Sequence, residues 1–156
     1  MIDHDSEQWR DLRNIKLLEW FGGNQSAVDF LVAISSIAEL WDDLVDKDKE
    51  PTRKDIDAVF WDALVTLPTN EFFSQHKTFL MPLVIQSINA WQDSVELERG
   101  DTNDRAYALT LRVIALQLAP MIVLLLRGKD AAREVSVDMW RYFTAHDDAM
   151  KWIKGE

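Results

Sequence analysis

The stretch Ala38-Glu39-Leu40-Trp41-Asp42-Asp43-Leu44-Val45-Asp46 places four carboxylates near the end of a segment that is otherwise apolar. At about 100° per residue in a helix, Asp42, Asp43 and Asp46 project within roughly a quarter of the circumference, with Glu39 one turn upstream. An apolar stripe therefore becomes acidic over its last two turns. Acidic residues at a helix C-terminus are unfavourable by up to ~1 kcal/mol each, so the cluster predicts a compensating cation.

Length and composition predict one helical domain over residues 1–156. A chain of 156 residues is long enough for one sizeable core and too short for two ordinary domains. Hydrophobic residues make up 47% of the chain, and it contains only five Gly and four Pro. That composition favours a compact helical protein over a disordered or β-sandwich chain.

The charge balance and the apolar runs exclude several classes of function. The chain has 27 acidic and 17 basic residues, so it lacks the basic footprint that nucleic acids require. The absence of cysteine excludes disulfides and thiolate metal sites. The most apolar run, Val113 to Leu126, is interrupted by Gln117 and Pro120 and is too short for a membrane span. Because Met1 to Arg10 is polar, we expect no signal peptide and a cytoplasmic protein.

Stop and start signals predict a bundle of about six helices. Gly22-Gly23 ends the first, and the pair Ser26 and Asp29 begins the second. Thr52-x-x-Asp55 reads as a capping box for the third, whose apolar face includes Phe60 and Leu64. The expected segments are residues 6–21, 26–48, 52–67, 71–97, 101–127 and 130–154.

Two prolines fall inside the long segments, and each marks a kink or a break. Pro82 interrupts the fourth segment and Pro120 the fifth. Short connections favour antiparallel neighbours, so the segments should alternate in direction through the bundle. With that alternation, Asp42, Asp46 and the Asn103-Asp104 pair fall at the same end.

A cluster of this kind fits a hard cation. Mg²⁺ takes oxygen ligands in octahedral geometry and is typically bound by a few carboxylates together with substrate phosphates. Asp42 and Asp46, one turn apart, meet that demand. Arg105 and Arg112 lie two turns apart, and they could either hold a diphosphate or pair with Asp42 or Glu96. The residues therefore leave a magnesium-diphosphate site and a structural ion network both open.

The segment Asp42-Asp43-Leu44-Val45-Asp46 resembles the DDxxD metal motif of class I isoprenoid and terpene synthases, all-α enzymes that bind a prenyl diphosphate through Mg²⁺. Asn103-Asp104 and Arg141-Tyr142 follow in the order of the cyclases' second metal motif and their arginine-tyrosine pair. The second motif departs from the family, because Tyr107 and Leu111 replace its hydroxyl and Glu ligands.

The resemblance implies a minimal or degenerate member with a terpenoid-synthase-like arrangement, acting as a Mg²⁺-dependent lyase or transferase on a prenyl diphosphate. It implies metal ligands at Asp42, Asp43, Asp46, Asn103 and Asp104. The diphosphate would be contacted by Arg141, Tyr142, Arg105 or Arg112.

Two other functions fit the same residues. The all-α nucleotide pyrophosphohydrolases of the MazG and dimeric dUTPase type also carry paired acidic motifs, similar in kind to Glu39-x-x-Asp42-Asp43-x-x-Asp46 with Asp93-x-x-Glu96. A non-catalytic interaction module, in which these groups form a buried ion network, is the third interpretation. A homodimer is also left open. His146-Asp147-Asp148 lacks the further His and Asp ligands of an HD-type metal site, so we expect His146 to be a surface residue.

Overall fold

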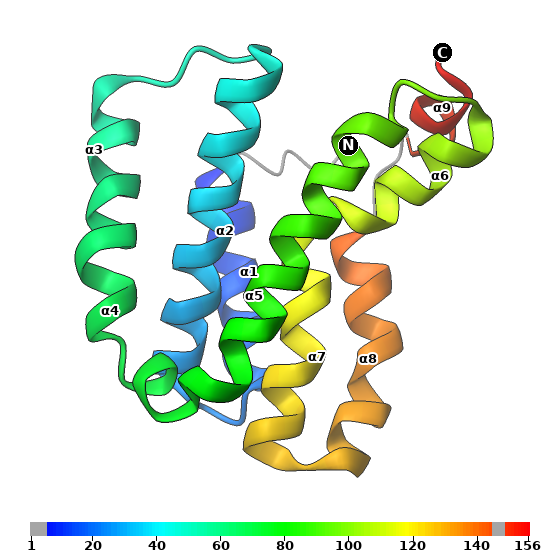
Figure 1. The fold of residues 1–156 in the computed structure, drawn as a ribbon. Helices are drawn as coiled ribbons and strands as arrows, with labels where there is room; N and C mark the ends of the chain where they lie inside the picture. Colours follow the sequence, from blue (N-terminus) through cyan, green and yellow to red (C-terminus); the bar gives the residue numbers. More distant parts are fainter. Residues whose placement is uncertain (1–5, 145–148) are drawn as a thin grey trace.

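The computed structural model of this protein describes residues 6–144 and 149–156, and no β-strand occurs among them. The predicted all-α class is confirmed. Figure 1 shows the arrangement, whose elements run in the order α1 (Glu7–Trp20), α2 (Gln25–Asp46), α3 (Arg53–Trp61), the π-helical segment η1 (Asp62–Thr66), α4 (Leu67–Thr69), α5 (Glu71–Leu97), α6 (Thr102–Leu111), α7 (Ile114–Arg127), α8 (Lys129–Phe143) and α9 (Ala149–Lys154).

Consecutive long helices alternate in direction, as short connections predict. In Figure 1, α2, α5 and α8 rise, whereas α3 and α7 descend between them. The C-terminal ends of α2 and α5 therefore lie at the same end of the bundle as α6 and α9. The acidic residues at the C-terminal end of α2 therefore lie at the same end of the bundle as α6, α9 and the end of α5.

The prolines do not break the chain where the sequence suggests. Helix α7 continues through Pro120, and the fifth predicted segment breaks instead at Val113, which has an extended conformation (φ −87°, ψ 92°). The axes of α6 and α7 differ by 45° across that break. Helix α5 contains Pro82, but its backbone departs from helical values at His76 (φ −117°, ψ 15°).

Several predicted helix ends are correct, but the sixth predicted segment, 130–154, is wrong as a single helix, because α8 ends at Phe143 and α9 is separate. The predicted start of the second helix also differs. The capping box of Thr52 and Asp55 forms, and Gly22 has the positive φ (64°) expected after a helix end. The second helix, however, is capped by Asn24, whose side chain accepts a hydrogen bond from the Ala27 amide. Ser26 does not cap α2. Its hydroxyl accepts a hydrogen bond from the Phe72 amide at 2.9 Å and so links α2 to the start of α5.

The core lies between α1, α2, α5, α7 and α8, and α3 stands outside it. Phe30 of α2 packs against the rings of Phe72 and Phe73, at centroid distances of 5.8 and 5.5 Å. Helix α3 contributes no buried residue. Its Phe60 and the following Leu64 are 58% and 71% exposed, so the predicted apolar face of the third helix is largely in contact with solvent.

None of the helices in the described ranges is, on its own, long and apolar enough to cross a membrane. Helices α6 and α7 meet that criterion only when they are taken together, across their 45° bend.

Candidate functional site

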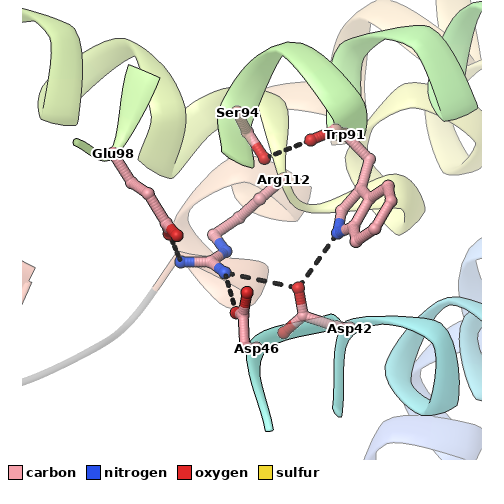
Figure 2. Close-up of polar contacts among 6 residues, drawn as sticks. All are labelled: Asp42, Asp46, Trp91, Ser94, Glu98 and Arg112. Atoms are coloured by element: carbon pink, nitrogen blue, oxygen red, sulfur yellow. Dashed lines mark hydrogen bonds and ion pairs between the residues drawn. The ribbon is translucent and has the colours of Figure 1, made fainter. Parts of the chain in front are cut away.

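The acidic end of α2 is organised around Arg112, the C-terminal cap of α6 (Figure 2). One terminal nitrogen of its guanidinium, Nη2, lies 3.5 Å from Asp42 Oδ1 and 3.8 Å from Asp46 Oδ2. The other, Nη1, lies 3.5 Å from Glu98 Oε2, at the end of α5. We call Asp42, Asp46, Glu98 and Arg112 the Arg112 cluster. It supplies the cation predicted for the acidic segment, from within the chain itself.

Asp42 is held from a second side by Trp91 of α5. The indole Nε1 of Trp91 donates a hydrogen bond to Asp42 Oδ1 at 3.0 Å, and the indole ring packs on Trp41 at 4.9 Å. The same turn of α5 is fixed by Ser94, whose hydroxyl donates to the Trp91 carbonyl at 2.6 Å. Arg112 also packs over the ring of Trp152 in α9, 5.4 Å from the centroid. Asp42 therefore has a fixed orientation.

The Arg112 cluster carries more negative than positive charge. Three carboxylates face one guanidinium, and their side chains are between 19% and 33% exposed. Burial, followed by the neighbouring charge of Asp42, raises the pKa of Asp46. Burial also raises the pKa of Glu98, although Arg112 opposes that shift. The cluster is thus a partly shielded ion network with a surplus of carboxylate.

The second predicted ligand pair, Asn103 and Asp104, is not part of this cluster. Their backbone amides donate to the side chain of Asp101, which caps the start of α6. Since a helix rises 1.5 Å per residue, Asn103 and Arg112 are about 13 Å apart along α6. Helix α6 lies at the same end of the bundle as the C-terminal end of α2 (Figure 1), but Asn103 and Asp104 are in its first turn, whereas Arg112 caps its other end.

The remaining predicted diphosphate contacts are also dispersed. Arg105 donates to the backbone carbonyls of Gly100 and Ile153, at 2.7 Å each, and so fastens α9 to the start of α6. Arg141 is exposed and pairs with Asp138 of its own helix. Tyr142 packs among aromatic rings, edge-on to Trp20 and Phe143 and stacked against Trp9. Of the four residues, only Arg112 adjoins the acidic end of α2.

No preformed metal centre is visible in residues 6–144 and 149–156: these residues contain no group of three or more His, Asp or Glu side chains placed to hold one ion. Asp43 lines a groove between α1, α2 and α3. His146, predicted to be a surface residue, lies outside the described residues, as do its neighbours Asp147 and Asp148.

A partly open pocket of about 230 Å³ adjoins the cluster, lined by residues of α1, α2, α5, α7 and α8 and by Arg112 and Val113 between α6 and α7. Its walls are mainly apolar and include Leu17, Leu31, Ile114 and Phe143. We call this cavity the interhelical pocket. Four charged residues also belong to its lining, namely Arg13, Glu39, Asp42 and Arg112.

A second, wider hollow of about 660 Å³ runs between α1, α2 and α3, and we call it the α1–α3 groove. Its lining is mostly polar, with Arg10, Asp43 and Asp55 among its charged residues. Arg13, Val32, Glu39 and Asp42 line both hollows, so the groove and the pocket adjoin at these residues.

Three residues of this region escape the sequence motifs: Glu98, Trp91 and Arg13. Glu98 and Trp91 lie on α5 and reach the cluster only through tertiary packing. Arg13 leaves a signal in the sequence, because it falls four residues after Trp9 and four before Leu17, on the apolar stripe of the first helix. A charged residue in such a stripe is unusual enough to mark a buried polar group.

No family model, curated protein or solved structure matches this chain.

Proposed function

We propose that this protein is a small-ligand-binding helical module and that its ligand occupies the interhelical pocket. One observation carries the proposal: a mainly apolar pocket of about 230 Å³ has a few charged residues in its lining. Ligand sites in proteins are typically apolar concavities with a few polar groups that orient the ligand. Binding is favoured over catalysis because the Asp42 carboxylate is already engaged by Trp91 and Arg112.

Occupancy of the pocket can be tested with a neutral apolar probe, octanol. Trp9 and Trp91 line the pocket, so a bound probe should change the tryptophan emission in a saturable way and raise the melting temperature. Ala38 also lines the pocket, and Ala38→Leu should fill part of it and weaken octanol binding. The matched control is Ala58→Leu, which adds the same bulk in the α1–α3 groove and should leave binding unchanged. No saturable response in the unmodified protein would overturn the proposal.

A second candidate function, Mg²⁺-dependent diphosphate binding, is favoured by the surplus of carboxylate beside the pocket. With three carboxylates and one arginine, the Arg112 cluster can accept further positive charge. Under this candidate, Mg²⁺ joins Asp42 and Asp46 to a diphosphate, and an apolar tail enters the pocket. The magnesium ion would have to displace Arg112 from Asp42 and Asp46, or bind these two carboxylates on the side that faces away from Arg112. Terpene synthase-like and MazG-like activity, and a cytoplasmic location, stay predictions.

The second candidate predicts that Mg²⁺ together with pyrophosphate stabilises the protein, whereas either one alone does not. A ligand specific for the folded state adds about 2.7 kcal/mol at a hundredfold excess over its Kd, which a melting curve detects readily. Asp46→Asn should abolish the shift, and Asp57→Asn, on the exposed surface of α3, should preserve it. An unchanged melting temperature in the unmodified protein rules the candidate out. With a positive shift, pyrophosphate release from farnesyl diphosphate or from a nucleoside triphosphate distinguishes the two enzyme families.

A further inference from the structure

Ser35 is an uncharged polar residue in the lining of the interhelical pocket. On α2 it lies in one stripe with Leu31, Ala38 and Asp42, which follow one another at helical spacing and all line the pocket. Since a helix rises about 1.5 Å per residue, Ser35 is about 10 Å from Asp42 along the helix axis. The neighbours of Ser35 on this stripe, one turn away on each side, are apolar.

The hydroxyl of Ser35 has no hydrogen-bond partner within residues 6–144 and 149–156. In the same part of the chain, every side-chain nitrogen or oxygen that is fully shielded from solvent does have a partner. The Ser35 oxygen is therefore accessible, although the residue as a whole is half-buried. Because a hydroxyl both donates and accepts, a ligand in the pocket can form a hydrogen bond with it in either direction.

The charged residues of the lining are balanced in sign and already engaged. Arg112 lies 3.5 Å from Asp42, and the Trp91 indole donates a hydrogen bond to the same carboxylate. Glu39 attracts Arg13 electrostatically. A charged head group in the pocket would be attracted by one member of each pair and repelled by the other, and it would lose hydration on entry. The lining therefore disfavours a ligand charge of either sign.

We propose that the interhelical pocket selects a neutral apolar ligand with one hydroxyl or carbonyl oxygen, which forms a hydrogen bond with the Ser35 hydroxyl. This inference rests on the proposed function, since it names the ligand class of the same pocket. The apolar walls, which include Leu17, Ile114 and Phe143, contact the hydrocarbon part of the ligand. The volume of about 230 Å³ limits that part to a short chain or a single ring.

Three probes with the same number of carbon atoms test the charge of the head group: octanol, octanoate and octylammonium, measured at neutral pH by tryptophan emission and melting temperature. Octanol should bind at least about tenfold more tightly than either ion, because only the ions lose the hydration of a charge. An ion that binds as tightly as octanol would overturn the inference and leave the pocket as a binding site. If none of the three probes binds, the proposed function fails as well.

The matched variants for the hydrogen bond are Ser35→Ala and Ser36→Ala, which remove a hydroxyl from neighbouring half-buried positions of α2. Ser35 lines the pocket, whereas Ser36 lines the α1–α3 groove. Ser35→Ala should weaken octanol binding by about threefold to tenfold, the range of one neutral hydrogen bond, and Ser36→Ala should leave it unchanged. Hexane has no hydrogen-bonding group, so neither variant should weaken its binding.

Equal octanol affinities for the unmodified protein and Ser35→Ala would contradict the inference. A parallel loss of octanol and hexane binding in Ser35→Ala would also contradict it, because that result would reflect a changed pocket shape. Both variants should fold normally, since alanine has the higher helix propensity, and without ligand they should melt at the temperature of the unmodified protein or slightly above it.

Discussion

At the scale of single residues, Arg112 is expected to contribute more to stability than any other charged residue discussed above. Arg112→Met leaves Asp42, Asp46 and Glu98 close together without their cation. Because these side chains are mostly shielded from solvent, we expect the free energy of unfolding to fall by about 2 kcal/mol. Urea denaturation measures the change.

The control for this variant is Arg99→Met. Arg99 pairs with Glu96 on an exposed helix surface, with side chains 69% and 78% exposed. Such pairs contribute at most about 1 kcal/mol and often nothing measurable. Equal denaturation midpoints for the two variants would contradict a central role for Arg112.

The raised pKa of Glu98 predicts a pH dependence of stability with a definite sign. In the unfolded chain its pKa is lower than in the folded protein, so the folded state binds more protons in the range between the two values. The contribution of Glu98 to the free energy of unfolding is therefore highest below the unfolded pKa and decreases as the pH rises through the folded pKa. Denaturation at several acidic pH values gives the free energy of unfolding of the unmodified protein and of Glu98→Gln. The value for the unmodified protein minus the value for the variant should decline as the pH rises.

Asp55 provides the opposite case for comparison. Hydrogen bonds from Thr52 lower the pKa of the Asp55 carboxyl in the capping box. Its contribution is present above the unfolded pKa and is lost as the pH falls through the folded value. The free energy of unfolding of the unmodified protein minus that of Asp55→Asn should therefore rise with pH. If the differences for Glu98 and Asp55 changed in the same direction with pH, the direction of one of the two pKa shifts would be wrong.

Some contacts of single residues in the Arg112 cluster could be predicted from the sequence, and others could not. Pairing of Arg112 with Asp42 was one of two alternatives that the residue types allow, and the structure contains it. The start of the helix at residue 101 was predictable, but the residue of this helix that meets the acidic end of α2 was not: Asn103 and Asp104 lie in the turn capped by Asp101, and Arg112 at the other end of α6 makes the contact. Short acidic motifs state which charges are available, and tertiary packing decides which of them meet.

At the scale of elements, α3 depends on its cap more than the other long helices do. It buries no residue, so little tertiary packing supports it beyond the hydrogen bonds of Thr52 and Asp55. Thr52→Ala should cost about 1 kcal/mol, and amide exchange in α3 should accelerate more than in α2.

The control for the cap is Thr78→Ala, an exposed position within α5. Alanine has the higher helix propensity, so this variant should be neutral or slightly stabilising. Uniformly accelerated exchange in both variants would show that α3 does not unfold on its own.

The break between α6 and α7 shows why helix boundaries are harder to predict than helices. Pro120 is the obvious local signal, yet α7 passes through it, and Val113 takes the extended conformation instead. Arg112, the residue before the break, is held by carboxylates of α2 and α5, which are distant in sequence. The helical pattern of residues 101–127 was therefore predictable, whereas the position of its bend depends on the rest of the fold.

At the scale of the whole molecule, apolar side chains divide into a buried set and an exposed set that sequence pattern does not distinguish. Phe60 and Leu64 have helical spacing, like Phe72 and Leu80, but only the second pair is buried. The double variant Phe60→Ser, Leu64→Ser should change the free energy of unfolding by no more than about 0.5 kcal/mol, the usual range for surface positions.

The buried counterpart is Phe72→Ala. Phe72 is 1% exposed and packs against Phe30 and His76, so its truncation should cost about 3 to 5 kcal/mol. Thermal denaturation of the two variants side by side makes the comparison. A large loss of stability in the double variant would mean that the exposed face of α3 is covered in solution, as in the homodimer that the sequence leaves open.

The Arg112 cluster also bears on the order of folding events. The pair Arg112–Asp42 joins positions 70 residues apart, so it requires the closure of a long loop. Contacts of this kind are entropically costly to form early, and we expect the cluster to be absent from the rate-limiting transition state. Arg112→Met should then leave the refolding rate nearly unchanged and accelerate unfolding, which stopped-flow measurements in urea can separate. The ion network would act mainly to prolong the lifetime of the native state once it has formed.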